Sequence, residues 1–181
     1  MIIFSALVVS TVVCSGILIV LYSLYNGISP MPTSPKVKHQ LLHVLSQNEI
    51  QGTICELGSG WGTLAFALAR RFPKCRIIAY ENSLVPYIYS QIYKLVIKTE
   101  NLHIKQENFF NAPLSKADVI VCYLSPDIMA CLQPKLESEL RQGTLVLTNT
   151  FALPSWIPQQ TVEVEDLYGT KIYIYLNQNK I

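Results

Sequence analysis

A run of seven residues with three alternating glycines, Glu56-Leu57-Gly58-Ser59-Gly60-Trp61-Gly62, limits the fold of this chain more than any other feature. The run follows a short apolar stretch, Thr53–Leu57, and precedes a helical pattern over Thr63–Phe72. A strand, a glycine turn and a helix in that order are typical of an open α/β sheet, in which a ligand binds above the carboxyl ends of the strands. Glycine allows the tight turn and the close approach of a ligand to the backbone. The run therefore predicts an α/β domain with a ligand site at this turn.

Apolar stretches and helical patterns alternate along the rest of the folded region. The predicted strands are Thr53–Leu57, Arg76–Tyr80, Leu102–Gln106, Ala117–Tyr123, Leu145–Thr150, Val162–Asp166 and Lys171–Leu176. The predicted helices are Pro35–Gln47, Thr63–Phe72, Val85–Lys98 and Ile128–Arg141, the last of which Pro134 should break or kink. Strands that are apolar on both faces and alternate with helices indicate a parallel sheet covered on two sides. The last two strands add an antiparallel hairpin, so we expect a Rossmann-like α/β sheet.

The N-terminal segment Ile2–Tyr25 contains no charged residue, in a chain that is 50% hydrophobic and 14% charged. As a helix it would span roughly 35 Å, enough for a bilayer core of about 30 Å. A cleaved signal peptide is the alternative, but it would begin with basic residues and end at a small-residue cleavage site, which we do not find here. We expect a transmembrane anchor over residues 1–25, a proline-rich linker over 26–35 and a folded domain over 36–181. Because Lys36 and Lys38 follow the segment, the positive-inside rule predicts a single-pass protein whose domain lies on the cytoplasmic side or on the equivalent side of an organelle membrane.

The charge and spacing of the glycine run indicate what kind of ligand it holds. A dinucleotide fold needs G-x-G-x-x-G, so that a pyrophosphate can lie on the helix N-terminus. Here the glycines alternate, and Glu56 stands two residues before the first of them. Its carboxylate would repel a phosphate but suits a ligand that carries an ammonium group and a sulfonium. Glu81 ends the second strand, where a carboxylate can accept both hydroxyls of a ribose.

This constellation resembles the class I S-adenosylmethionine-dependent methyltransferases. In that family the glycine loop lies under the methionine part of the cofactor, the second acid holds the ribose, and an acid or amide after the third strand lies near the adenine. The resemblance implies S-adenosyl-L-methionine as the cofactor and a seven-stranded sheet. The cofactor-binding residues that it implies are Thr33, Glu56, Gly58, Ser59, Gly60, Gly62, Glu81, Asn82, Asn108 and Phe109. Asn108 departs from the commoner Asp, but an amide can still meet the adenine amino group.

Three further stretches, in the same order, resemble the small membrane-anchored protein-lysine methyltransferases of mitochondria (the adenine nucleotide translocase and ATP synthase c-subunit type) and their bacterial relatives. They are Pro30–Val37, Tyr123–Pro126 and Phe151–Trp156. The mitochondrial members act on inner-membrane proteins, so the resemblance implies a protein substrate that is embedded in a membrane or close to one. It also implies that the region around Thr33 closes over the cofactor.

A lysine amine, with a pKa of about 10.4, must lose its proton before it attacks a methyl group, and an apolar aromatic pocket lowers that pKa. The predicted catalytic residues that form this pocket are Tyr123, Ser125, Pro126 and Trp156, with Phe151 beside them. We expect Tyr123 and the backbone of Leu124 and Ser125 to orient the neutral amine.

Other interpretations stay open at this point. The aromatic residues of the proposed pocket also fit ordinary packing, as do Tyr87, Tyr89 and Tyr93 on the third predicted helix. The linker also fits a spacer between the membrane and the domain. A net charge of +2 without a basic stripe gives no reason to expect nucleic acid. A methyltransferase for a small lipid-soluble molecule or RNA, and a membrane scaffold that binds the cofactor without turnover, are the alternatives. His39 and His43 are spaced as metal ligands, but no third ligand accompanies them, and we expect no metal.

Overall fold

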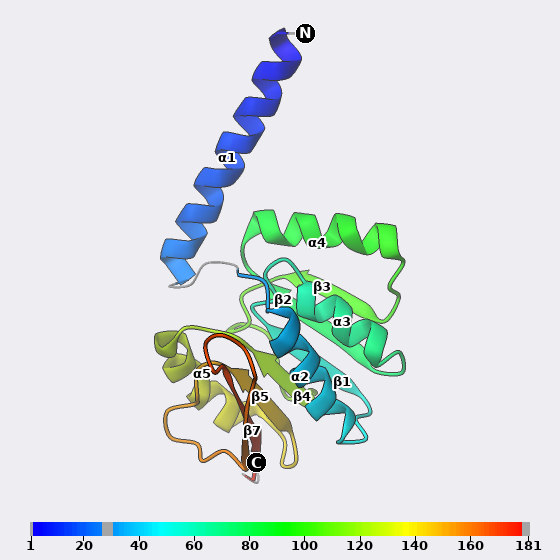
Figure 1. Cartoon of the computed structure of the whole chain (residues 1–181), viewed down its shortest axis with the longest axis vertical. Helices are drawn as coiled ribbons and strands as arrows, with labels where there is room; N and C mark the ends of the chain where they lie inside the picture. The colour runs from blue at the N-terminus through cyan, green and yellow to red at the C-terminus, as the bar shows by residue number, and fades with distance from the viewer. Residues whose placement is uncertain (1, 27–30, 179–181) are drawn as a thin grey trace.

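The computed structural model describes residues 2–26 and 31–178, which form an N-terminal helix and an α/β domain (Figure 1). One sheet has the strand order β3-β2-β1-β4-β5-β7-β6. β1 to β5 are parallel, β7 pairs antiparallel with β5, and β6 pairs antiparallel with β7. The strands are β1 Thr53–Leu57, β2 Arg76–Glu81, β3 Leu102–Gln106, β4 Val119–Cys122, β5 Leu145–Asn149, β6 Gln160–Glu163 and β7 Lys171–Leu176. The helices are α1 Ile2–Asn26, α2 Pro35–Ser46, α3 Thr63–Arg71, α4 Leu84–Ile97 and α5 Pro126–Glu139. The predicted Rossmann-like sheet with a C-terminal antiparallel hairpin is confirmed.

Helices cover both faces of the sheet, and each face closes a hydrophobic core. α2, α3 and α4 lie on one face, around buried side chains such as Leu41, Leu68 and Ile77. α5 and the segment 108–117 lie on the other, around Leu57 and Leu132. The central strands β1, β4 and β5 are almost entirely buried because they are covered on both sides. The strand order reverses between β1 and β4, which is where an open sheet leaves a crevice at its carboxyl edge.

The first strand of the hairpin lies earlier in the sequence than we expected. β6 covers residues 160–163, whereas the pattern suggested 162–166. The reason is a turn held by Asp166, whose carboxylate accepts hydrogen bonds from the backbone N–H groups of Tyr168 and Thr170, both at 3.0 Å. Asp166 therefore ends the strand region instead of belonging to it, as is common for Asp in turns.

α5 also differs from the expectation, because it begins at Pro126 and runs unbroken through Pro134. Ser125 is its N-cap residue, and proline suits the first helical position. Pro134 lies on the exposed side of α5, as does Ala130 one turn earlier. The carbonyl that loses its N–H partner can therefore bond to water, which limits the cost of an internal proline.

α1 projects from the domain (Figure 1). Its apolar side chains are exposed along its length. In the described chain it is the one helix long and apolar enough to cross a membrane: its 22 residues Ile3–Leu24 have a mean hydropathy of 2.5, and none of that window is buried. A signal sequence meets the same criterion, so the single-pass anchor stays a prediction. α1 contacts the domain at α4.

Candidate functional site

A cavity of about 360 Å³ lies at the carboxyl edge of the sheet, above the point where the strand order reverses. Its volume is within the usual range for a small-molecule site. The predicted site residues that line it are Thr33, Glu56, Gly58, Ser59, Gly60, Glu81, Asn82, Asn108, Phe109 and Tyr123. The structure therefore brings together side chains from the linker, the glycine turn and the ends of β2, β3 and β4.

The backbone of the glycine turn is bonded to the end of β2. The N–H groups of Gly58 and Ser59 both donate to the carbonyl of Tyr80, at 3.0 and 2.9 Å, and the N–H of Gly60 donates to Glu81 Oε2 at 2.6 Å. A phosphate-binding loop needs free N–H groups that converge on the anion. Since these three are already used inside the protein, the turn offers side chains to its ligand and is unsuited to a pyrophosphate.

Two glycines of the turn are required by its conformation and by close packing. Gly58 and Gly62 both have φ of +75°, a region that other residues rarely adopt. A Cβ on Gly58 would lie 2.9 Å from Leu124, and one on Gly62 would lie 2.9 Å from Phe66. Gly62 does not line the cavity; it precedes α3 as the N-cap residue and lets α3 pack closely on its neighbours.

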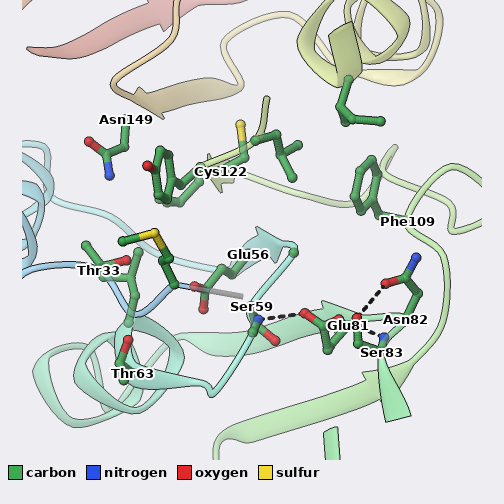
Figure 2. Close-up of a pocket in the computed structure, with 18 of the residues that line it drawn as sticks. Thr33, Glu56, Ser59, Thr63, Glu81, Asn82, Ser83, Phe109, Cys122 and Asn149 are labelled. Atoms are coloured by element: carbon green, nitrogen blue, oxygen red, sulfur yellow. Dashed lines mark hydrogen bonds between the residues drawn. The ribbon is translucent and has the colours of Figure 1, made fainter. Parts of the chain in front are cut away.

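Glu56 is buried at the floor of the cavity, and its Oε2 has no hydrogen-bond partner. Burial raises the pKa of its carboxyl well above the usual range, and the negative charge of Glu81 raises it further; a hydrogen bond with the backbone of Ala65 acts in the opposite direction. Ser59 Oγ is a second buried oxygen without a partner. Figure 2 shows the side chains of Glu56 and Ser59 between Thr33 and Glu81. A buried carboxylate with one oxygen that lacks a partner favours a cationic ligand group.

One end of the cavity is formed by Glu81, Asn82 and Phe109 (Figure 2). The carboxylate of Glu81 is held by two backbone N–H groups, that of Gly60 on Oε2 and that of Ser83 on Oε1 at 2.7 Å. Each carboxylate oxygen can accept more than one hydrogen bond, so a fixed carboxylate can still receive two ligand hydroxyls. Asn108 and Phe109 follow β3. The amide oxygen of Asn108 accepts the N–H of Phe110 at 3.0 Å, which holds this turn in place.

The other end of the cavity contains a residue that the sequence analysis missed, Asn149, at the end of β5 (Figure 2). Asn149 is 5% exposed, and its Oδ1 accepts a hydrogen bond from Thr150 Oγ1 at 3.1 Å. Thr150 has φ of +69°, a strained value for a β-branched residue. Tyr123 lies at the same edge and stacks on Phe151, with ring centroids 6.4 Å apart and planes 9° apart. The sequence signal that could have indicated Asn149 is an amide side chain at the carboxyl end of an otherwise apolar predicted strand, LVLTN.

Three of the predicted catalytic residues do not line the cavity: Ser125, Pro126 and Trp156. Ser125 Oγ is nevertheless a buried atom without a hydrogen-bond partner, just beyond the lining residue Leu124. Trp156 packs edge-on against Tyr175 with centroids 5.9 Å apart, and its Nε1 donates to Glu137 Oε1 at 2.8 Å. These contacts hold Trp156 between α5 and the sheet. Within residues 2–26 and 31–178, no group of three or more His, Cys, Asp or Glu side chains is arranged to hold a metal ion.

Comparison with known proteins identifies relatives of the whole domain. The family described as "ANTKMT methyltransferase domain" matches residues 56–160. A protein-lysine N-methyltransferase from Saccharolobus islandicus is 29% identical over 151 residues, which cover 81% of this chain and 91% of that protein. The crystal structure of an RNA methyltransferase from Salinibacter ruber, in complex with S-adenosyl-L-homocysteine, is 26% identical with a TM-score of 0.71, and the match covers 83% of this chain and 96% of that one. A precorrin-6y C5,15-methyltransferase from Geobacter metallireducens shares the fold at 11% identity, with a TM-score of 0.62 over 82% of this chain and 94% of that one.

Proposed function

The chain belongs to the ANTKMT methyltransferase domain family, and on that premise we propose that it transfers a methyl group from S-adenosyl-L-methionine to a lysine side chain of a membrane-associated protein. Its class, a methyltransferase that uses S-adenosylmethionine, agrees with a similar structure that holds S-adenosyl-L-homocysteine. The lysine substrate is supported by the relative from Saccharolobus islandicus, which is a protein-lysine N-methyltransferase. The single observation that carries the proposal is the buried Glu56 carboxyl in the cavity, whose Oε2 has no hydrogen-bond partner.

The residues of the cavity fit the cofactor. Glu56 and Ser59 present buried oxygens without partners, which suit the ammonium group of the methionine part. At the end of the cavity formed by Glu81, Asn82 and Phe109, the fixed carboxylate of Glu81 suits the two ribose hydroxyls. Phe109 offers an aromatic face to the adenine. When bound, S-adenosylmethionine supplies a methyl group that its sulfonium has already activated. The protein's task is then to position the amine and to exclude water.

We assign the amine site to the end of the cavity formed by Tyr123 and Asn149. A neutral lysine amine needs hydrogen-bond acceptors that point its lone pair at the methyl group, and the Tyr123 hydroxyl and Asn149 Oδ1 are acceptors at this edge. The stacked rings of Tyr123 and Phe151 provide an apolar wall, which disfavours the ammonium form of lysine and so lowers its pKa. Ser125 and Pro126 would act by fixing the start of α5 behind this wall, and Trp156 by holding α5 against the sheet.

The short distance between the cavity and α1 supports a substrate lysine near the membrane surface. Met31 and Thr33 line the cavity, and Thr33 follows Leu24, the last residue of the apolar span, by nine residues. Nine residues extend at most about 32 Å, so the cavity lies close to the end of the span. If α1 crosses a membrane, lysines near the surface of that membrane are within reach, on the cytoplasmic side according to Lys36 and Lys38.

RNA is a second candidate substrate, because the similar structure from Salinibacter ruber is an RNA methyltransferase. The net charge of +2 gives this chain little general attraction for a polyanion. The methyl-transfer assay described next distinguishes a protein substrate from an RNA substrate.

The test is transfer of a radiolabelled methyl group from S-adenosylmethionine into native membranes by the full-length protein. We expect label in protein that resists ribonuclease and lipid extraction. At a cofactor concentration below the Kd of the variant, Glu56→Gln should reduce the label about tenfold or more, whereas Glu100→Gln, an exposed carboxylate in the loop before β3, should not change it. Label that ribonuclease removes would favour the RNA substrate, label in extracted lipid would favour a small lipid-soluble acceptor, and absence of label despite cofactor binding would contradict an enzymatic function.

A further inference from the structure

We propose that α4 is a second membrane contact and lies flat in the interface of the bilayer that α1 spans. The inference rests on the proposed function, in which α1 is a membrane anchor. It adds a surface that neither the family nor the cavity assigns.

The outward face of α4 is apolar, although it is exposed. Six side chains of this helix, all large and hydrophobic or aromatic, are between 41% and 78% exposed: Ile88, Tyr89, Ile92, Tyr93, Leu95 and Val96. We call them the α4 surface. They follow helical spacing and therefore form one continuous stripe, whereas the buried residues of α4 are Pro86 and Ser90. The sequence pattern predicted Tyr87, Tyr89 and Tyr93 as packing residues, and all three do pack. Tyr87 lies against the core, and the rings of Tyr89 and Tyr93 contact Trp61 and Phe66 edge-on, although both keep an exposed side.

The other helices of the domain differ from α4 in what they expose. α2 exposes Lys36 and His39, α3 ends with exposed Arg70 and Arg71, and α5 exposes Asp127. On α4 the single charged residue is Lys94, followed by Lys98 as the C-cap residue. A contiguous apolar patch on one helix among polar neighbours indicates an interaction site. A helix with an apolar face, aromatic residues and basic residues has the composition of helices that lie in a membrane interface.

The position of α4 indicates a bilayer as the partner. α1 and α4 are in contact, and Figure 1 shows α4 running across the direction of α1, on the side of the domain toward which α1 projects. The exposed apolar side chains of α1 and the α4 surface are therefore neighbours, and a membrane crossed by α1 meets α4 next. Tyr89 and Tyr93 suit the headgroup level, where aromatic side chains are common.

This contact would fix the height and direction of the cavity. α4 begins directly after Ser83, which lines the cavity, so the helix and the cofactor site move as one body. α1 alone does not determine how the domain is turned about the axis of that helix. A second contact removes that freedom, and the amine site then faces one layer of lysines just above the membrane surface.

The experiment uses the full-length protein in nanodiscs of phosphatidylcholine with brominated acyl chains, which quench tryptophan at the depth of the bromines. Trp61 and Trp156 are the two tryptophans of the chain, so W61F/W156F gives a background without tryptophan. Ile92→Trp reports on the α4 surface, Ala130→Trp on α5 across the sheet is the matched exposed control, and Ile17→Trp in α1 shows insertion. Leu95→Trp is a second reporter, used if Ile92→Trp fails to fold as judged by circular dichroism.

We expect bromination to quench about half of the emission of Ile92→Trp, because an interfacial helix buries its apolar face roughly 5–10 Å into the headgroup boundary. Ala130→Trp should keep the emission that it has in discs without bromine. Quenching of Ile17→Trp with none at Ile92→Trp or Leu95→Trp would overturn the α4 contact and leave the anchor intact. A blue shift of the Ile92→Trp emission without quenching by bromine would show that the side chain is shielded from water but not by lipid. If that shift is seen in discs with two copies and not in discs with one, a second copy covers this face and the proposal is overturned. Quenching at none of these positions would overturn the anchor and the α4 contact together. The readout needs no methyl transfer, so it is independent of whether the proposed substrate is correct.

Discussion

Glu56 gives the sharpest test of the site, because the same buried carboxyl should favour cofactor binding and destabilise the free protein. Glu56→Gln keeps the shape of the side chain and removes its negative charge. A hydrogen bond to a charged group contributes about 1.5–3 kcal/mol, so losing the ammonium contact should weaken cofactor binding by roughly 10- to 150-fold. The affinity of the unmodified protein should rise with pH as Glu56 loses its proton. Glu56→Gln should not show that rise.

The effect on the stability of the free protein has the opposite sign. Because folding raises the pKa of Glu56, its contribution to stability is fully present at pH below the unfolded value of 4.5 and is lost as pH rises through the folded pKa. At neutral and alkaline pH, Glu56→Gln should therefore have a higher Tm than the unmodified protein in the absence of cofactor. The difference should disappear below pH 4.5.

The assays are isothermal titration with S-adenosylhomocysteine and thermal unfolding with and without it, from pH 4 to 9. For a domain of this size, each 1 kcal/mol corresponds to about 2–4 °C in Tm, which such scans resolve. Glu100→Gln, an exposed carboxylate, should change neither measurement. Cofactor affinity of Glu56→Gln within twofold of the unmodified protein, or a lower Tm at neutral pH, would refute the argument that this carboxyl is a buried charge held for a cation.

Three further predictions concern the amine site, α5 and the buried thiols. Asn149→Ala should lower kcat about 10- to 100-fold with little change in cofactor affinity, because it removes an acceptor near the amine; a change in cofactor binding alone would contradict this role. Trp156→Phe should lower the Tm by roughly 2–6 °C, because it removes the hydrogen bond to Glu137, and the variant should keep most of its activity. A loss of activity at unchanged Tm would instead indicate that Trp156 contacts the reacting groups. Burial raises the pKa of Cys122 to about 12, so iodoacetamide at pH 8 should label exposed Cys131 in the folded protein and should label Cys122 only in denaturant. Peptide mass spectrometry can identify the labelled residue. Labelling of Cys122 without denaturant would contradict this prediction and show that the cavity opens.

The sequence predicted those parts of the fold and of the candidate site that depend on neighbouring residues in the chain. The glycine turn predicts its own strand and helix, and the acid at Glu81 ends the strand that pairs with β1, so both reach the same cavity. Asn149 was missed because its strand reaches the cavity through the sheet order, in which β5 lies beside β4, and not through a local motif.

The differences between the expectations and the structure have a similar origin in tertiary contacts. Trp156 follows the fifth strand as the family resemblance suggested, but the loop turns its ring toward Tyr175 and away from the cavity. The spacing of Tyr89 and Tyr93 shows that they share a side of a helix but not whether that side meets a core, water or lipid. Pro134 was expected to break α5, and only its position on the exposed side explains why the helix continues.

The most direct test of the central claim is to map the methyl group. The full-length protein is incubated with membranes and S-adenosylmethionine carrying a trideuterated methyl group, and tryptic and chymotryptic peptides are analysed by mass spectrometry beside the Glu56→Gln variant. The account predicts a deuterated methyl-lysine in a membrane protein, close to the membrane surface, that is strongly reduced with Glu56→Gln at limiting cofactor. Deuterated methyl on RNA or lipid with none on lysine, or equal labelling by the variant, would contradict it.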